Sequence, residues 1–446
     1  MPGLSTIVSA VRSVLCYRRL RPRQLQAHRD RAVRRLIRHA YGKVPYYRRL
    51  MDGQGVRPED IRGAADLCRI PVTDRNTLQE LAPDEITARG TSPDRLKRTR
   101  TSGATGKPIS IRRTWWEQRL HSLFWLRARH YFGLRPTDRV ASISFIRSGP
   151  GHGLQLHQIP LRALGLYRKH RIDCCLQADE IADALYELRP DWVGGQAGAV
   201  ARVGRFLMED PRPPLRPRAV AAGGQMITPG IRRDIVHGFD APFFTAYASH
   251  EFGLIAWECE QTGELHVCDD SLVLELLQDG RPVGPGERGE VVGTDLLSYA
   301  MPFIRYSLGD LAVRGGSACP CGLPFSTIER IEGRTVDFFP LPDGRTLHPY
   351  RVVGAFLDIA PWVRRYQLVQ EATDRIWLRI VPYRTPTPEQ LERVDGKIRP
   401  ILGPEVDFRI ELTDDPDIPP GEKYRILRSR VTEAVDGSTE TQGAGD

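Results

Sequence analysis

Residues 101–108 read TSGATGKP, a run of hydroxyl residues and glycines closed by one lysine and a proline, and no other stretch of the chain is as informative. Small side chains let the backbone approach a bound group closely, and glycine permits turns that other residues resist. Backbone N–H groups and hydroxyls in such a loop can bind phosphate oxygens, and Lys107 adds a positive charge. The spacing is not that of a Walker loop, which needs G-x-x-x-x-G-K-[ST]. The run therefore predicts a nucleotide phosphate loop of another kind.

The length and composition predict a globular protein of several domains. A chain of 446 residues is too long for one ordinary core, so we expect two or three domains. Hydrophobic residues make up 41% and charged residues 27%, which is typical of soluble proteins. No apolar run reaches the roughly 20 residues of a membrane-spanning helix, and Arg12 interrupts the apolar stretch at 7–16, which is unlike a signal peptide. We therefore expect a cytoplasmic protein.

The net charge of +9 comes mainly from arginine, and many of these arginines lie in the first fifty residues. On helices such a run of charge usually forms a solvated face. Contact with an acidic partner or with an anionic membrane surface is the alternative, so a peripheral membrane contact through the basic N-terminus stays open. No RNA- or DNA-reading motif accompanies the charge, and we expect no nucleic acid partner.

The spacing of apolar residues along the chain predicts an α/β fold with two domains. Helical apolar spacing marks residues 1–70, and short apolar strands then alternate with helices, as in parallel sheets covered by helices. At about 255–333 the pattern changes to a β subdomain of short strands with Gly/Pro turns. We expect a large N-terminal core of residues 1–333, a small mobile α+β C-terminal domain of residues 334–435 and a disordered tail of residues 436–446. The candidate strands are 140–145, 192–194, 219–222, 242–247, 364–370, 375–381 and 407–412, and the candidate helices are 178–188, 199–208 and 388–401.

The 101–108 run resembles the phosphate loop of the adenylate-forming enzymes, the acyl-CoA synthetase-like superfamily. It is most similar to the S-[ST]-G-x-T-G-K-P loop of the phenylacetate–CoA ligase and capsule-biosynthesis ligase-like branch. Five later stretches resemble further family motifs, in the family's order. They are Ala222–Gln225 for the adenine-side turn, Tyr247–Glu251 for Y-G-x-[ST]-E, Arg305–Asp310 for R-Y-x-x-G-D, Gly333-Arg334 for the hinge before a mobile domain, and Gly421–Arg425, where that domain carries its catalytic lysine.

This resemblance implies a role for each matching residue. Lys423, Lys107 and Glu251 would be catalytic, with Glu251 also binding Mg²⁺, a hard cation that prefers oxygen ligands. Asp310 would accept hydrogen bonds from the ribose hydroxyls of ATP. The other nucleotide-binding residues would be Thr101, Ser102, Gly103, Thr105, Gly106, Gly223, Gly224, Gln225, Tyr247, Ala248, Ser249, His250 and Arg334.

The chain also departs from the family pattern. Ala104 replaces a hydroxyl residue often present in the loop, which removes one hydrogen bond to phosphate. His250 stands where serine or threonine is usual, and Glu422 separates Gly421 from Lys423. A surface lysine is therefore the alternative interpretation of Lys423.

The cysteines give a second signal, because eight cysteines without a secretory signal indicate thiols or metal ligands rather than disulfides. Cys319 and Cys321 form a tight pair that can chelate one ion, and Cys259 and His266 lie upstream of them. Three sulfurs and one imidazole are typical of a closed structural zinc site, and the pattern also resembles part of the same ligase branch. Cys268 is an alternative ligand, and reduced side chains packed without metal are the alternative to zinc. We expect the remaining cysteines to be buried by packing; they are Cys16, Cys68, Cys174 and Cys175.

The position of an acyl pocket follows only from the resemblance, which puts it between the helix after the phosphate loop and the segments before the adenine-side turn. The candidates are Trp115, Trp116, Phe145, residues 194–198 and Met226. Core packing is the alternative for the aromatic residues, and the glycines of 194–198 would leave room for a planar or bulky acid.

The resemblance implies a two-step ligase. A carboxylate attacks the α-phosphorus of Mg·ATP to give an acyl-adenylate and pyrophosphate, and a nucleophile then displaces AMP. The predicted partners are a small carboxylic acid and an acceptor, which is coenzyme A, a carrier-protein thiol or an amine; a homodimer stays open. Two other functions also stay open: an ATP-binding phosphotransferase or ATPase, and a non-catalytic binding or scaffold protein that keeps the fold.

Overall fold

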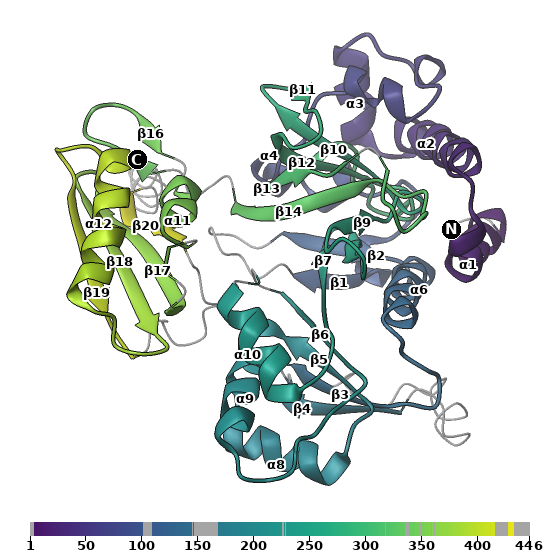
Figure 1. Cartoon of the computed structure of the whole chain (residues 1–446). Helices are drawn as coiled ribbons and strands as arrows, with labels where there is room; N and C mark the ends of the chain where they lie inside the picture. Colours follow the sequence, from purple (N-terminus) through teal and green to yellow (C-terminus); the bar gives the residue numbers. More distant parts are fainter. Residues whose placement is uncertain are drawn as a thin grey trace, which may run out of the picture. The chain divides into compact units, whose positions relative to one another are not determined.

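The computed structural model describes residues 4–100, 109–144, 146, 168–224, 227, 229–316, 318–334, 339–347, 349–357, 359–360, 362–414 and 427–431 (Figure 1). The chain divides into two compact units. One contains residues 1–226 and 235–333, and the other contains residues 227–234 and 334–446. Among the described residues, no helix is both long enough and apolar enough to span a bilayer.

Helices open the first unit. They are α1 (Leu4–Cys16), α2 (Pro22–Lys43), α3 (Pro45–Gly53), α4 (Arg75–Glu80) and α5 (Pro83–Ile86), with short 3₁₀ helices at Tyr17–Arg19, Pro58–Asp60, Ala64–Arg69 and Pro93–Arg95. A proline occupies the first turn of α2 and α3, where its missing N–H costs nothing. The largest core of the unit joins these helices to the sheet, with Val33, Tyr47, Trp257 and Phe303 among its fully buried side chains.

A twelve-stranded sheet runs through the first unit in the order β11-β10-β12-β13-β14-β9-β8-β7-β6-β5-β3-β4. Its parallel part comprises β4 (Arg168–Asp173), β3 (Arg139–Ser144), β5 (Trp192–Gln196), β6 (Ala219–Gly223) and β7 (Phe243–Ser249). The helices α8 (Ala178–Leu188), α9 (Ala197–Glu209) and α10 (Pro229–Phe239) connect successive parallel strands. Figure 1 shows α8 and α9 beside this part of the sheet. These crossovers are the pattern that the alternation of strands and helices predicted.

The remaining strands of the sheet are antiparallel to β7 or to one another. They are β8 (Gly253–Glu258), β9 (Leu265–Val267), β10 (Leu272–Gln278), β11 (Arg281–Pro282), β12 (Arg288–Asp295), β13 (Tyr306–Arg314) and β14 (Thr327–Arg334). Because β7 pairs with β6 on one side and β8 on the other, it joins the parallel and antiparallel parts.

A separate hairpin of β1 (Lys97–Arg100) and β2 (Ser110–Arg113) flanks the predicted phosphate loop, and residues 101–108 themselves lie outside the described residues. Helix α6 (Trp115–Tyr131) follows directly. Thr114 caps this helix, since its hydroxyl accepts a hydrogen bond from the Glu117 N–H, and the Glu117 carboxylate accepts one from the Thr114 N–H.

The second unit has a core of its own. Its four-stranded sheet has the order β19 (Asp407–Leu412), β18 (Arg375–Pro382), β17 (Val363–Ala372) and β20 (Leu427–Ser429). The unit also contains the short pair β15 (Phe339–Pro340) and β16 (Thr346–Leu347) and the helices α11 (Tyr350–Leu357) and α12 (Pro388–Leu402). Side chains such as Phe356, Tyr366 and Ile398 pack between sheet and helices. The strands and helices predicted at 364–412 are confirmed to within two residues at each end.

Candidate active site

The predicted nucleotide residues that the structure describes come from three neighbouring places in the first unit. Gly223 and Gly224 end β6, Tyr247 to Glu251 lie at the end of β7 and in the turn to β8, and Asp310 lies in β13. The backbone of Arg334 ends β14, but its side chain is not described. The loop residues Thr101 to Lys107, Gln225 and Lys423 lie outside the described residues, so their roles stay predictions.

Two glycines let the end of β6 run close to β7. A Cβ atom on Gly223 would lie 3.2 Å from the carbonyl oxygen of Ala246, a distance tighter than ordinary contact. Gly224 has a φ of +82°, in the left-handed region that favours glycine. The turn predicted to face adenine therefore lies against the residue that precedes Tyr247.

Tyr247 and Asp310 form a direct contact. The Tyr247 hydroxyl donates a hydrogen bond of 2.6 Å to Oδ2 of Asp310, 63 residues away in the sequence. A bulge between β12 and β13 displaces the register at Leu308 to Asp310, and Gly309 within it has a φ of +68°. A hydrogen bond from a phenol to a carboxylate is charge-assisted and stronger than a neutral one. The structure thus brings together the residues predicted to bind adenine and ribose.

Glu251 lies in the tight turn between β7 and β8. The Ser249 hydroxyl accepts a hydrogen bond of 3.0 Å from the Phe252 N–H, which closes the turn. Gly253 then has a φ of +68°, and a Cβ atom there would lie 2.8 Å from Nδ1 of His121. The turn is therefore held by its own hydrogen bond and by α6, and Glu251 itself is mostly buried.

A buried arginine that the sequence did not single out supports this turn. Arg113, the last residue of β2, donates to the carbonyl oxygen of His250 at 2.9 Å and also to that of Glu251. Its Nε donates to the Ser298 hydroxyl at 3.2 Å, and Asp295 lies 3.8 Å away as a counter-ion. Arg113 therefore ties the strand after the phosphate loop to the turn that carries Glu251.

A buried carboxylate, that of Asp295, balances the positive charge of Arg113. Asp295 is fully buried, and His121 approaches its Oδ2 at 3.2 Å. Burial alone would raise the pKa of Asp295, but His121 and then Arg113 hold it below its usual value. No local sequence pattern predicts the cluster of Arg113, His121 and Asp295 at the Glu251 turn, because Arg113 and this turn are 137 residues apart. Two arginines directly before a helix cap were the only local signal.

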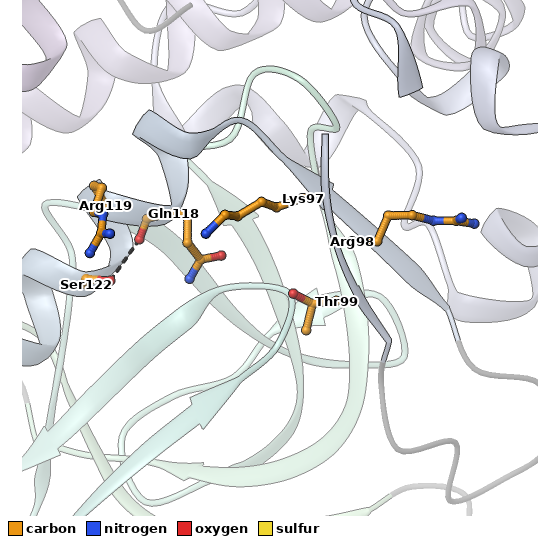
Figure 2. Close-up of a pocket in the computed structure, with 6 residues that line it drawn as sticks. All are labelled: Lys97, Arg98, Thr99, Gln118, Arg119 and Ser122. Carbon is orange, nitrogen blue, oxygen red and sulfur yellow. Dashed lines mark hydrogen bonds between the residues drawn. The ribbon is translucent and has the colours of Figure 1, made fainter. Parts of the chain in front are cut away.

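A polar pocket of about 370 Å³ lies between β1 and the first turns of α6 (Figure 2). Its lining residues are Lys97, Arg98, Thr99, Gln118, Arg119 and Ser122. Three of them are cationic and none is acidic, so the pocket suits an anion. Because β1 leads directly into residues 101–108, this positive surface lies at the base of the predicted phosphate loop.

The four predicted zinc ligands meet at the other end of the antiparallel strands. Their ligand atoms lie within 4.8 Å of one another, including Cys259 Sγ and Cys319 Sγ at 3.6 Å and His266 Nε2 and Cys321 Sγ at 3.2 Å. Burial lowers the pKa of His266 to about 4, which keeps its imidazole neutral at pH 7. Burial would raise the pKa of Cys259, but N–H groups of the following turn lower it to about 7. The alternative ligand Cys268 is not in this cluster; it is buried beside Arg127.

The structure contradicts two other expectations. Cys68 and Cys175 are exposed, so the expectation that packing buries them is wrong. Gly194 and Gly195 offer no space for an acid, because the Trp192 ring and the backbone of Ile143 fill the positions of their missing side chains. Of the other acyl-pocket candidates, Trp115 and Trp116 are each 45% exposed, while Phe145 and Met226 lie outside the described residues.

Curated ligases are similar to most of the chain. No family model matches the chain. Phenylacetate-coenzyme A ligase of Thermus thermophilus is 28% identical over 362 residues, which cover 78% of this chain and 79% of the ligase. The enzyme of the same name from Escherichia coli is 26% identical over 340 residues, covering 70% and 72% of the two chains. The chain is thus similar to phenylacetate-coenzyme A ligases along most of its length.

A solved structure supports the fold. The structure of 2-hydroxyisobutyryl-CoA ligase in its postadenylation state covers 92% of each chain with a TM-score of 0.72, at 19% identity. At 19% identity this similarity supports the fold, and it does not identify a substrate.

Proposed function

We propose that this protein is an ATP-dependent acid–thiol ligase that activates a small carboxylic acid and transfers its acyl group to coenzyme A. The carboxylate oxygen attacks the α-phosphorus of ATP, and the bond to pyrophosphate breaks. The thiol sulfur then attacks the acyl carbon of the adenylate, AMP leaves, and the thiol proton passes to solvent. The observation that carries this proposal is the Tyr247–Asp310 hydrogen bond beside the Glu251 turn, in a chain related to phenylacetate–CoA ligases along most of its length.

The chain's own residues would bind and orient the nucleotide. The 101–108 loop and Lys107 would hold the phosphates, with the cationic pocket around Lys97 drawing the polyanion towards them. Gly223 and Tyr247 would flank adenine, Asp310 would bind the ribose hydroxyls, and the carboxylate of Glu251 offers the oxygen ligands that Mg²⁺ prefers. Arg334 would contact the nucleotide.

Lys423, from the second unit, would neutralise charge on the α-phosphate as the adenylate forms. The two units recognised in the chain fit a core of residues 1–333 and a lid of residues 334–435, with the hinge between Gly333 and Arg334. Rotation of the lid would bring different residues to the site for the two steps. A homodimer is compatible with this chemistry but is not required by it.

The acceptor and the acid follow from the relatives rather than from the site. Phenylacetate–coenzyme A ligases acylate coenzyme A, as their name states, and this favours coenzyme A over a carrier-protein thiol or an amine and an aryl-substituted acid as the first candidate substrate. The absence of a disulfide among the eight cysteines, all of them described residues, and a need for ATP fit the cytoplasm.

The cysteine–histidine cluster would hold one structural Zn²⁺. Three sulfurs and one imidazole are a donor set that suits zinc, and all four atoms are close enough to share one ion. Bound there, zinc would link β8, β9 and the turn at Cys319–Cys321, which lies in a part of the fold that is otherwise joined mainly by short strands.

Carboxylate-dependent exchange of labelled pyrophosphate into ATP tests the proposed chemistry. A panel of acids that begins with phenylacetate should give exchange with at least one member, and adding coenzyme A should then give AMP and a thioester. Glu251→Gln should lower exchange at least about tenfold, whereas the matched change Glu209→Gln, at an exposed end of α9, should not. ADP as the product would instead establish a phosphotransferase or ATPase.

A further inference from the structure

The first helix exposes an apolar stripe. Val8, Val11 and Leu15 of α1 are 57%, 38% and 75% exposed. They recur at i, i+3 and i+7, so they lie on one face of the helix. Ser13, on the opposite face of the helix, and Val14, about a quarter turn from the stripe, are buried against the rest of the unit. The stripe therefore has no partner among the described residues, although the other face of the same helix is packed.

Arginines border this stripe on α1 and continue beyond it. Arg12 lies on α1 one turn after Val8, Arg19 lies in the 3₁₀ helix after α1, and Arg21 and Arg23 lie at the start of α2; all four are exposed. Residues 1–29 contain six arginines and no aspartate or glutamate. An exposed apolar stripe beside cationic side chains is typical of a helix that lies in the plane of a membrane surface.

We propose that the α1 docking face, formed by Val8, Val11 and Leu15 with the arginines at 12, 19, 21 and 23, binds an anionic phospholipid surface. The apolar stripe would enter the boundary between headgroups and acyl chains, and the arginines would meet lipid phosphates. A nucleic acid would satisfy the charge but leave the stripe in water. If a second copy of this chain bound here, two arginine clusters without aspartate or glutamate would lie together and repel each other.

The proposal is independent of the ligase chemistry, because none of these residues belongs to the candidate active site. Docking would hold the enzyme at a membrane while leaving its catalytic residues unchanged. This separation allows the two proposals to fail separately.

Vesicle co-sedimentation of the full chain tests the docking face. We expect binding to phosphatidylcholine vesicles that contain 30% phosphatidylglycerol, weak binding to pure phosphatidylcholine, and loss of binding as salt rises. The double change Arg19→Glu with Arg21→Glu should weaken the partition at least about twentyfold, since each arginine near an anionic surface contributes about fivefold. The control Arg281→Glu with Arg375→Glu makes the same change in net charge at exposed positions elsewhere and should bind like the parent.

Leu15→Asp tests the apolar stripe and should weaken binding at least about tenfold. Its control, Val72→Asp, changes an apolar side chain that is 41% exposed elsewhere and should have no effect on binding. Equal binding to neutral and anionic vesicles, or parent-like binding by both α1 variants, would overturn the proposal. So would a parent chain that ignores vesicles but binds DNA, or that forms a dimer which Leu15→Asp disrupts.

Discussion

Tyr247 and Asp310 illustrate how one hydrogen bond can orient a carboxylate that we propose binds the nucleotide. The Tyr247 hydroxyl donates to Oδ2 of Asp310 at 2.6 Å and so fixes the carboxylate at the end of β7. Tyr247→Phe keeps the ring and removes only this donor. Because hydrogen bonds to charged groups contribute about 1.5–3 kcal/mol, we expect the KM for ATP in pyrophosphate exchange to rise about tenfold. Tyr186→Phe, a half-buried tyrosine on α8, is the control. An unchanged KM for ATP in Tyr247→Phe would separate this pair from nucleotide binding.

Arg113 is a positioning residue at the same scale. Its fork of N–H groups meets two backbone carbonyls of the Glu251 turn, which the single ammonium of lysine cannot do in the same geometry. We therefore expect Arg113→Lys to keep most of the fold and to weaken the apparent affinity for Mg·ATP about tenfold. Arg113→Gln should also destabilise the protein by about 3–5 kcal/mol, because it leaves Asp295 buried without its arginine partner.

The matched control for Arg113 is its neighbour Arg112→Lys. Arg112 is also mostly buried, but its Nη1 donates to the carbonyl oxygen of Ser110 and not to the turn. If Arg113→Lys showed a parent-like KM for Mg·ATP and Arg113→Gln lost only thermal stability, Arg113 would be structural and not positioning.

At the scale of elements, we expect a histidine of α2 to make the stability of the protein depend on pH. His39 donates from Nε2 to the carbonyl oxygen of Tyr299 at 2.9 Å, and burial lowers the pKa of His39. Below its ordinary value near 6.5, the unfolded chain takes up this proton while the folded chain still resists it. The free energy of unfolding should therefore fall as pH drops from about 7 to 5.

His39→Gln checks this dependence by urea unfolding at several pH values. Glutamine can still donate to Tyr299 but does not titrate, so the fall in stability between pH 7 and 5 should become shallower. The exposed His237→Gln should leave the slope as in the parent. A His39 variant with the parent slope would assign the pH dependence to another group.

The cysteine–histidine cluster makes a prediction for the antiparallel half of the sheet. We expect elemental analysis to find one zinc per purified chain. Cys319→Ser should lose this metal and lower the thermal midpoint by at least about 5 °C, because the ion's binding energy is also folding energy. Cys68→Ser, at an exposed cysteine outside the cluster, should change neither quantity. A parent protein purified without zinc would contradict the proposed zinc site.

Local sequence foretold much of the architecture. The apolar runs of β5 and β6 and the intervening helix were predictable because strands that are largely buried leave a nearly continuous apolar signal. Cys259 and Cys319 could be paired across 60 residues because thiols are chemically distinctive. The role of Arg113 could not be predicted in this way. Arginine is common in this sequence, and only the fold brings the carbonyl oxygen of His250 within reach of Arg113. The prediction for the glycines of β5 failed for a related reason: the Trp192 ring fills the space at Gly194, and the backbone of Ile143 fills the space at Gly195.

For the whole molecule, the proposed hinge lies at one of the places where the chain passes between the two compact units. Gly333 and Arg334 form this junction, and Gly333 has a φ of +117°, which L-residues with a side chain rarely adopt. Gly333→Ala would force this junction into another backbone conformation. If the junction is the hinge of a lid, the two half-reactions should suffer unequally, because each needs a different arrangement of the lid.

Two assays separate these half-reactions. Pyrophosphate exchange reports adenylation, and thioester formation from a synthetic acyl-adenylate with coenzyme A reports transfer. We expect Gly333→Ala to change the ratio of the two rates at least about fivefold. Gly396→Ala is the matched control, because its Cβ on α12 would meet no atom within 4 Å. Equal losses in both assays together with a lower thermal midpoint would mean that Gly333 serves stability alone and that the units need no hinge at this residue.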